Sequence, residues 1–228
     1  MSSTNGPVAD HLLGDRIAEF NAALAEQAPV EVVKGLANEI DGVVRSGAGA
    51  KAPRVGEKAP SFILPDALGN RVSLDALLKE GPAVISFYRG QWCPYCDLQL
   101  RAYQEVLPRI KALGGKLVAI SPQTPDESLS TAEKRKLAFY VLSDAGNQIA
   151  RGYGLVWKVP PGLDALQRGF GVDLTKSNGD ASNELPVPGI FVLGADGRIA
   201  FRYVNADWRE RLEPAQIVRA LEGLGRDK

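Results

Sequence analysis

A pair of cysteines, Cys93 and Cys96, restricts the fold more than any other feature of the sequence. The pair directly follows a short apolar run at residues 83–88, which predicts a buried strand. Pro94 favours the first position of a helix, where its missing N–H costs nothing. A Cys-x-x-Cys pair between a strand and a helix of a βαβ unit is typical of thiol redox chemistry.

The rest of the main domain alternates between strand-like and helix-like segments. The expected strands are 62–64, 71–74, 83–88, 116–121, 138–142, 189–193 and 198–204. The expected helices are 74–79, 94–113, 128–136 and 213–224. This order predicts an α/β fold whose sheet is partly parallel, and a turn at 195–197 predicts an antiparallel C-terminal hairpin. Residues 155–185 follow no clear period.

Two helical patterns precede this domain. Apolar residues recur at helical spacing over residues 10–27, where Asp10 is a candidate cap, and a second helix is expected from Pro29 onward. A Gly- and Ala-rich stretch then predicts a linker. We therefore expect an N-terminal helical extension and linker at 1–53 and the main domain at 54–228. A partner-binding or dimerising arm is the alternative interpretation of the extension.

Composition excludes several classes of function. The 27 basic and 27 acidic residues balance, so the chain lacks the basic excess typical of nucleic-acid binding. It has one histidine, His11, which excludes a multi-histidine zinc site. No apolar run approaches the ~20 residues that cross a bilayer, and no signal peptide is recognisable. We expect a cytoplasmic protein without membrane contact, metal or organic cofactor.

The helix start gives the two thiols their expected chemistry. Unpaired N–H groups and the helix dipole at that point predict that the pKa of Cys93 is lowered. The i,i+3 spacing places Cys96 within reach, so one sulfur can attack and the other resolve. A structural metal site, two inert cysteines and an iron–sulfur cluster shared between chains are the alternatives, and a catalytic thiol pair is favoured.

Four segments resemble the peroxiredoxin-like branch of the AhpC/TSA superfamily. They are VGEKAPSF at 55–62, FYRGQWCPYC at 87–96, VAISPQ at 118–123 and LPVPGIFVL at 185–193. The resemblance implies a thioredoxin-like fold, with a central mixed sheet flanked by helices. It also implies that Cys93 attacks, that Cys96 resolves, and that Pro188 belongs to a cis-proline loop facing the thiols; an ordinary trans proline before a strand is the alternative. Trp92 is expected to shield the thiols with its ring, and a plain packing role is the alternative.

Two positions depart from the family pattern. Gly90 stands where peroxiredoxins place a threonine, and Gly189 where they place an arginine. These groups normally orient the peroxide, and Arg89 is the candidate substitute for the missing charge. A solvated residue at a strand end is the alternative for Arg89.

The resemblance implies a thiol oxidoreductase that reduces peroxides, disulfides or both. Thioredoxin, glutaredoxin or a small thiol would recycle it, and a homodimer is compatible with the sequence. One alternative is a disulfide reductase without significant peroxidase activity. The other is a redox-sensing interaction protein that docks through residues 1–50.

Overall fold

The computed structural model describes residues 12–127 and 136–225. The described helices are α1 (Leu12–Gln27), α2 (Val30–Arg45), α3 (Leu74–Glu80), α4 (Pro94–Ala112), the 3-10 turn η1 (Ala145–Asn147), α6 (Gln148–Gly152), α7 (Pro161–Gly169), α8 (Leu174–Asn178) and α9 (Pro214–Leu224). The described strands are β1 (Ile63–Pro65), β2 (Arg71–Ser73), β3 (Ala83–Phe87), β4 (Lys116–Ser121), β5 (Tyr140–Ser143), β6 (Val156–Lys158), β7 (Glu184–Pro186), β8 (Gly189–Leu193) and β9 (Ile199–Val204).

The central sheet is mixed, as the sequence predicts. Its five strands are ordered β5-β4-β3-β8-β9. β3, β4 and β5 run parallel, whereas β8 is antiparallel to both β3 and β9. Every residue of β3 and of β8 is buried, as expected for continuous apolar strands at the centre of a sheet that is covered on both faces. The loop that carries the cysteines follows the carboxyl end of β3.

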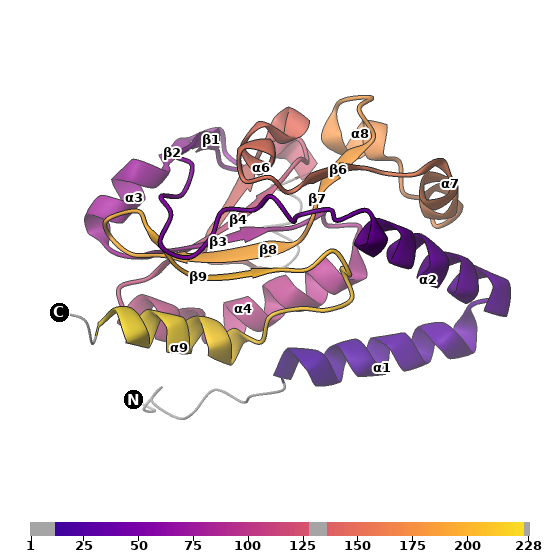
Figure 1. Cartoon of the computed structure of the whole chain (residues 1–228), viewed down its shortest axis with the longest axis horizontal. Coiled ribbons are helices and arrows are strands. Elements are labelled where there is room, and N and C mark those ends of the chain that lie inside the picture. The colour runs from indigo at the N-terminus through magenta and orange to yellow at the C-terminus, as the bar shows by residue number, and fades with distance from the viewer. Residues whose placement is uncertain (1–11, 128–135, 226–228) are drawn as a thin grey trace.

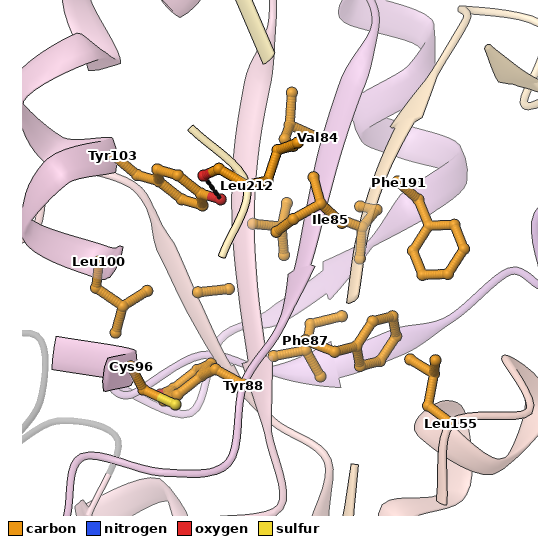
Figure 2. Packing of buried hydrophobic residues seen from close by; sticks show 14 of the residues in the cluster. Val84, Ile85, Phe87, Tyr88, Cys96, Leu100, Tyr103, Leu155, Phe191 and Leu212 are labelled. Atoms are coloured by element: carbon orange, nitrogen blue, oxygen red, sulfur yellow. Dashed lines mark hydrogen bonds between the residues drawn. The ribbon is translucent and has the colours of Figure 1, made fainter. Parts of the chain in front are cut away.

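Helices cover both sides of this sheet (Figure 1). α4 and α9 pack against each other on one face, and α1 lies against the outer side of α4. The β1–β2 hairpin and α6 lie over the opposite face. The buried residues form one hydrophobic cluster that includes both cysteines. Figure 2 shows Cys96 among these core side chains, together with the hydrogen bond of 3.1 Å from the Tyr103 hydroxyl to the Leu212 carbonyl.

The N-terminal helices dock onto the domain through specific contacts. The backbone N–H groups of Leu13 and Gly14 donate to the Glu213 carboxylate at 3.1 and 2.6 Å. Further along α1, the Tyr95 hydroxyl lies 2.7 Å from the Asn21 side-chain oxygen, and Phe20 contacts the Tyr95 ring edge-on. The first helix thus contacts the first turn of α4, which carries the thiol pair.

Most expected elements are present. The hairpins β1–β2 and β8–β9 are confirmed, and α4 continues through Pro108 as one helix. The unassigned stretch 155–185 contains β6, α7, α8 and part of β7. The expected helix at 128–136 falls almost entirely outside the described residues, as do Asp10 and His11. No helix within 12–127 or 136–225 combines the length and apolar character needed to span a bilayer.

Candidate active site

The two thiols lie at the N-terminus of α4, where the sequence places them. Cys93 is the residue that caps the helix, and its carbonyl accepts hydrogen bonds from the N–H groups of Cys96 and Asp97 at 3.0 and 3.1 Å. Pro94 is the first helical residue, and it is exposed. Both cysteines are unbonded to each other and have no exposed surface. The pair is therefore a reduced dithiol enclosed by the protein.

Arg89 is buried beside the first thiol. Its side chain is only 3% exposed, and its Nη1 lies 3.7 Å from the Cys93 sulfur. The guanidinium lies between two indole rings, 4.8 Å from the centre of Trp92 and 4.1 Å from that of Trp208. These rings hold the cation in place through cation–π attraction. The solvated alternative for Arg89 is therefore wrong.

A second guanidinium, from Arg211, approaches the other thiol. Its Nη2 lies 3.5 Å from the Cys96 sulfur, and its Nη1 donates to the Gln99 side-chain oxygen at 2.6 Å. The Trp208 carbonyl accepts a third bond at 2.8 Å, and Gln99 in turn donates to the Ser86 hydroxyl at 3.1 Å. Arg211 could not be predicted from the sequence, because no local motif marks it and its contact with Cys96 spans 115 positions.

The two sulfurs share a hydrogen bond and titrate as a pair. Burial raises the pKa of Cys93, and the hydrogen bond to Cys96 raises it further. Burial alone would also raise the pKa of Cys96. The hydrogen bond from Cys93 and the charge of Arg211 outweigh burial and hold the pKa of Cys96 well below its ordinary value. These directions are opposite to the sequence-based expectation that the helix start lowers the pKa of Cys93.

The two glycines that depart from the family pattern differ in the space around them. Gly90 has φ of +151°, and a Cβ there would collide with the indole nitrogen of Trp92. At Gly189 a Cβ would lie 3.3 Å from Phe191 and 3.4 Å from Leu155, which is a close but nearly ordinary contact. Two arginines, Arg89 and Arg211, reach the sulfurs from other positions.

Pro188 lies at the same end of the sheet as the thiol loop, but its peptide bond is not in the expected cis conformation. The described peptide bonds are all trans, so the predicted cis-proline loop is wrong. Val187 lies between β7 and β8, and its N–H donates to the Leu155 carbonyl at 2.9 Å. An extended residue before proline is compatible with a trans bond. Because Gly189 pairs with Phe87, Pro188 is still close to the strand end that carries the thiol loop.

A cavity of about 240 Å³ adjoins the thiol loop. Arg89, Trp92 and Pro94 form part of its wall, and the N-terminal helices and α7 contribute apolar residues. Trp92 thus covers Gly90 on one side and faces this cavity on the other. Within the described residues, no three His, Cys, Asp or Glu side chains come together as metal ligands.

The chain is similar in sequence to known thiol proteins. A chloroplastic peroxiredoxin Q of Populus jackii is 35% identical over 100 residues, which cover 44% of this chain and 46% of that protein. The thiol-disulfide oxidoreductase ResA of Bacillus thuringiensis is 22% identical over 160 residues, covering 70% and 75% of the two chains. The chain thus spans about half the length of the curated peroxiredoxin Q relatives it matches.

Solved structures and a family profile extend the likeness. The crystal structure of the peroxidoxin BcpB from Mycobacterium tuberculosis superimposes with a TM-score of 0.59 at 20% identity, covering 75% of this chain and 97% of that one. That likeness establishes the peroxiredoxin type of thioredoxin-like fold. The profile of the AhpC/TSA family matches residues 55–202, which is more than half of the chain. The protein belongs to the AhpC/TSA family.

Proposed function

We propose that this protein is a thiol-dependent peroxide reductase. The observation that carries the proposal is the reduced Cys93/Cys96 pair at the start of α4, with Arg89 3.7 Å from one sulfur and Arg211 3.5 Å from the other. A buried thiolate persists only where positive charge or hydrogen bonds compensate it. Two guanidiniums at a single dithiol supply that compensation and can also stabilise an oxygen that becomes negative.

The shared proton suggests how the first step proceeds. Cys93 transfers its proton to Cys96 while its sulfur attacks the distal oxygen of the peroxide. The S–O bond forms, the O–O bond breaks, and the departing oxygen takes the proton from Cys96. This leaves Cys93 as a sulfenic acid and Cys96 as a thiolate again. Arg89 is the group placed to stabilise charge on the departing oxygen.

The second step closes a disulfide. The Cys96 thiolate attacks the sulfur of the Cys93 sulfenic acid, and hydroxide leaves and takes up a proton. Two thiols are oxidised and one peroxide is reduced to water and an alcohol or a second water. A reduced dithiol protein of the thioredoxin or glutaredoxin type, or a small thiol, would then return the disulfide to its starting state.

Rapid-mixing oxidation of the reduced protein, followed by mass spectrometry, tests this proposal. With hydrogen peroxide the wild type should form one intramolecular disulfide. Cys96→Ser should stop at a sulfenic acid on Cys93, and Cys93→Ser should not consume peroxide. A sulfenic acid trapped on Cys96 instead would reverse the two roles, and no oxidation by peroxide would refute the function.

A second activity, disulfide reduction, is favoured by a specific observation. Gly90 and Gly189 stand where the family has its peroxide-orienting threonine and arginine, and a Cβ at Gly90 would collide with Trp92. One lost donor to a developing oxyanion costs about a hundred- to a thousandfold in rate. We therefore propose peroxide reduction that is slow for a peroxiredoxin, together with disulfide reduction at a comparable or higher rate. The rates of reaction with hydrogen peroxide and with a model disulfide, measured on the same protein preparation, test this proposal.

A further inference from the structure

Trp208 lies in the turn between β9 and α9, beyond residue 202, where the match to the family profile ends. Its side chain is buried. Local hydrogen bonds fix the turn on both sides of it: the Asp207 N–H donates to the Asn205 side-chain oxygen at 2.9 Å, and the Asp207 carboxylate accepts the N–H and the guanidinium of Arg209 at 3.0 and 2.7 Å. The backbone that carries the Trp208 indole therefore has a defined position.

Two groups of Trp208 contact the two arginines of the dithiol. The central carbon of the Arg89 guanidinium lies 4.1 Å from the centre of the Trp208 ring. The Nε of Arg211 donates to the Trp208 carbonyl at 2.8 Å. These two guanidiniums lie 3.7 Å from the Cys93 sulfur and 3.5 Å from the Cys96 sulfur, respectively. A single buried residue thus contacts both cations that reach the sulfurs.

Arg89 depends on such contacts more than Arg211 does. Arg211 donates to two oxygens, the Trp208 carbonyl and the Gln99 side chain. The Nη1 of Arg89 contacts the Cys93 sulfur, but its Nε is buried and has no hydrogen-bond partner within the described part of the chain. Burial lowers the pKa of Arg89, since a desolvated cation is destabilised. The faces of the indole rings are groups that compensate this desolvation.

Of the two indoles at Arg89, that of Trp208 is held more firmly. Trp92 is partly exposed, and the centre of its ring lies 4.8 Å from the guanidinium. Trp208 is nearer, and its ring also stacks on the buried Trp157 ring, with centroids 5.8 Å apart and an interplanar angle of 8°. Trp157 belongs to β6, so the stack joins the turn to a strand. A ring fixed in this way restricts where the cation can lie.

We propose that Trp208 is a positioning residue of the dithiol, whose indole ring keeps the Arg89 guanidinium at the Cys93 sulfur. It acts through Arg89 rather than on a substrate. When the ring is removed, the guanidinium is free to move away from the sulfurs, and the thiolate loses part of its compensation. The expected effect on peroxide reduction rests on the proposed function, whereas the effect on the thiols is measured without any peroxide.

The dithiol faces charged and titratable groups from three parts of the chain. They are Arg89 from the loop after β3, Tyr95 from α4 and Arg211 from the segment before α9. Burial raises the pKa of Tyr95 to about 12, so this hydroxyl stays neutral while the thiols titrate. The charge of Arg89 lowers the pKa of both sulfurs. Because complete removal of a nearby opposite charge raises a thiol pKa by about 1–3 units, displacement of Arg89 should raise it by about 1 unit.

The test is the pH–rate profile of thiol alkylation on the full chain, for variants whose fold is checked by circular dichroism. Trp208→Leu removes the ring but leaves the carbonyl that Arg211 contacts, and it should move the acid limb about 1 unit to higher pH. Trp208→Phe keeps a smaller aromatic face and should show about half of that shift. In an Arg89→Met background, Trp208→Leu should add no shift, because the ring then has no cation to hold. Under the proposed function, kcat/KM for hydrogen peroxide should fall about tenfold in Trp208→Leu at a pH below the limb.

Tyr153→Leu is the matched control. The Tyr153 ring is buried against Phe87 and Phe191, so this variant also loses a buried aromatic side chain, and it should leave the profile unchanged. If Trp208→Leu does not fold, Trp208→Phe decides by the same measurement. An unshifted profile in the Trp208 variants, an equal shift in Tyr153→Leu, or a full further shift in the Arg89→Met background would each overturn the proposal. A wild type that hydrogen peroxide does not oxidise, with the profile shifts as expected, would refute the function and leave the positioning role standing.

Discussion

At the scale of single residues, the charge on the dithiol depends on Arg211. An opposite charge at close range lowers the pKa of a thiol by about 1–3 units, and the guanidinium is 3.5 Å from the Cys96 sulfur. Removing it destabilises the thiolate, so the pKa of Cys96 must rise. We predict that Arg211→Met moves the acid limb of the pH–rate profile of thiol alkylation to higher pH by about 1–3 units.

Two further variants make this prediction specific. Arg211→Lys keeps the positive charge and should recover part of the shift. Arg101→Met removes a cation that is 55% exposed on the same helix as the thiols, where it pairs with Asp97, and it should leave the profile unchanged. An acid limb in Arg211→Met that coincides with the wild type would show that Arg211 does not support the thiolate.

A substitution at Gly90 tests whether a steric clash excludes the threonine that the family has at this position. Threonine at this position would need φ near +151° and would collide with Trp92. Strained backbone of this kind costs about 1–3 kcal/mol, so we predict that Gly90→Thr lowers the free energy of unfolding by that amount in urea denaturation. Gly42→Ala in α2, where a Cβ meets no neighbour, should instead gain about 0.5–1 kcal/mol. A Gly90→Thr protein as stable as the wild type would contradict the steric argument.

Part of the site could be predicted from sequence because it is local. Cys93, Cys96 and Arg89 lie in one strand–turn–helix segment, whose pattern determines their positions. Arg211 returns from a distant loop, and only tertiary packing brings it to Cys96. The hydrogen bond between the two sulfurs and the charge of Arg211 also depend on that packing, so the helix dipole alone does not determine the direction of either pKa shift.

At the scale of elements, a strand with a longer apolar pattern in the sequence is predicted better than a short one. β4 was expected at its observed bounds, because four apolar residues between polar ends suffice to identify a strand. β6 and β7 have three residues each and pair with one another across α7 and α8. Segments this short show no period, and their pairing over nearly thirty positions is a tertiary contact.

The start of α1 gives a prediction at this scale. The Glu213 carboxylate accepts two N–H groups at the start of this helix, where negative charge is favoured. We predict that Glu213→Ala lowers the free energy of unfolding by about 0.5–2 kcal/mol, the usual cost of losing a cap. Urea denaturation measures this change, and Glu210→Ala, an exposed neighbour, is the control. Equal stability of the two variants would mean that the contact contributes nothing to docking of the helix.

At the scale of the whole molecule, the N-terminal helices are joined closely to the family domain. Arg202 in β9 donates to the carbonyls of Ala52 and Pro53 at 2.9 and 3.2 Å, which fixes the end of the linker. The division into 1–53 and 54–228, the homodimer and the cytoplasmic location stay predictions. Limited proteolysis tests the boundary, and sedimentation tests the dimer.

The enclosure of both sulfurs has a consequence for reactivity. Neither cysteine has exposed surface, so a bulky reagent reaches them only after part of the cover opens. The hydrogen bond of 2.7 Å between Asn21 and Tyr95 holds α1 on the first turn of α4, and its loss should cost about 1 kcal/mol. Because local opening follows this free energy, the open population of Asn21→Ala should rise about fivefold.

We therefore predict that Asn21→Ala is labelled about fivefold faster than the wild type by a bulky maleimide dye under native conditions. Asn70→Ala removes a side-chain hydrogen bond of similar kind to Asp66 in the β1–β2 turn and should react at the wild-type rate. Both variants should be labelled at equal rates in denaturant, where no cover exists. If Asn21→Ala matches the wild type under native conditions, reagents reach the thiols by a route that does not involve α1, such as movement of Trp92 toward the cavity.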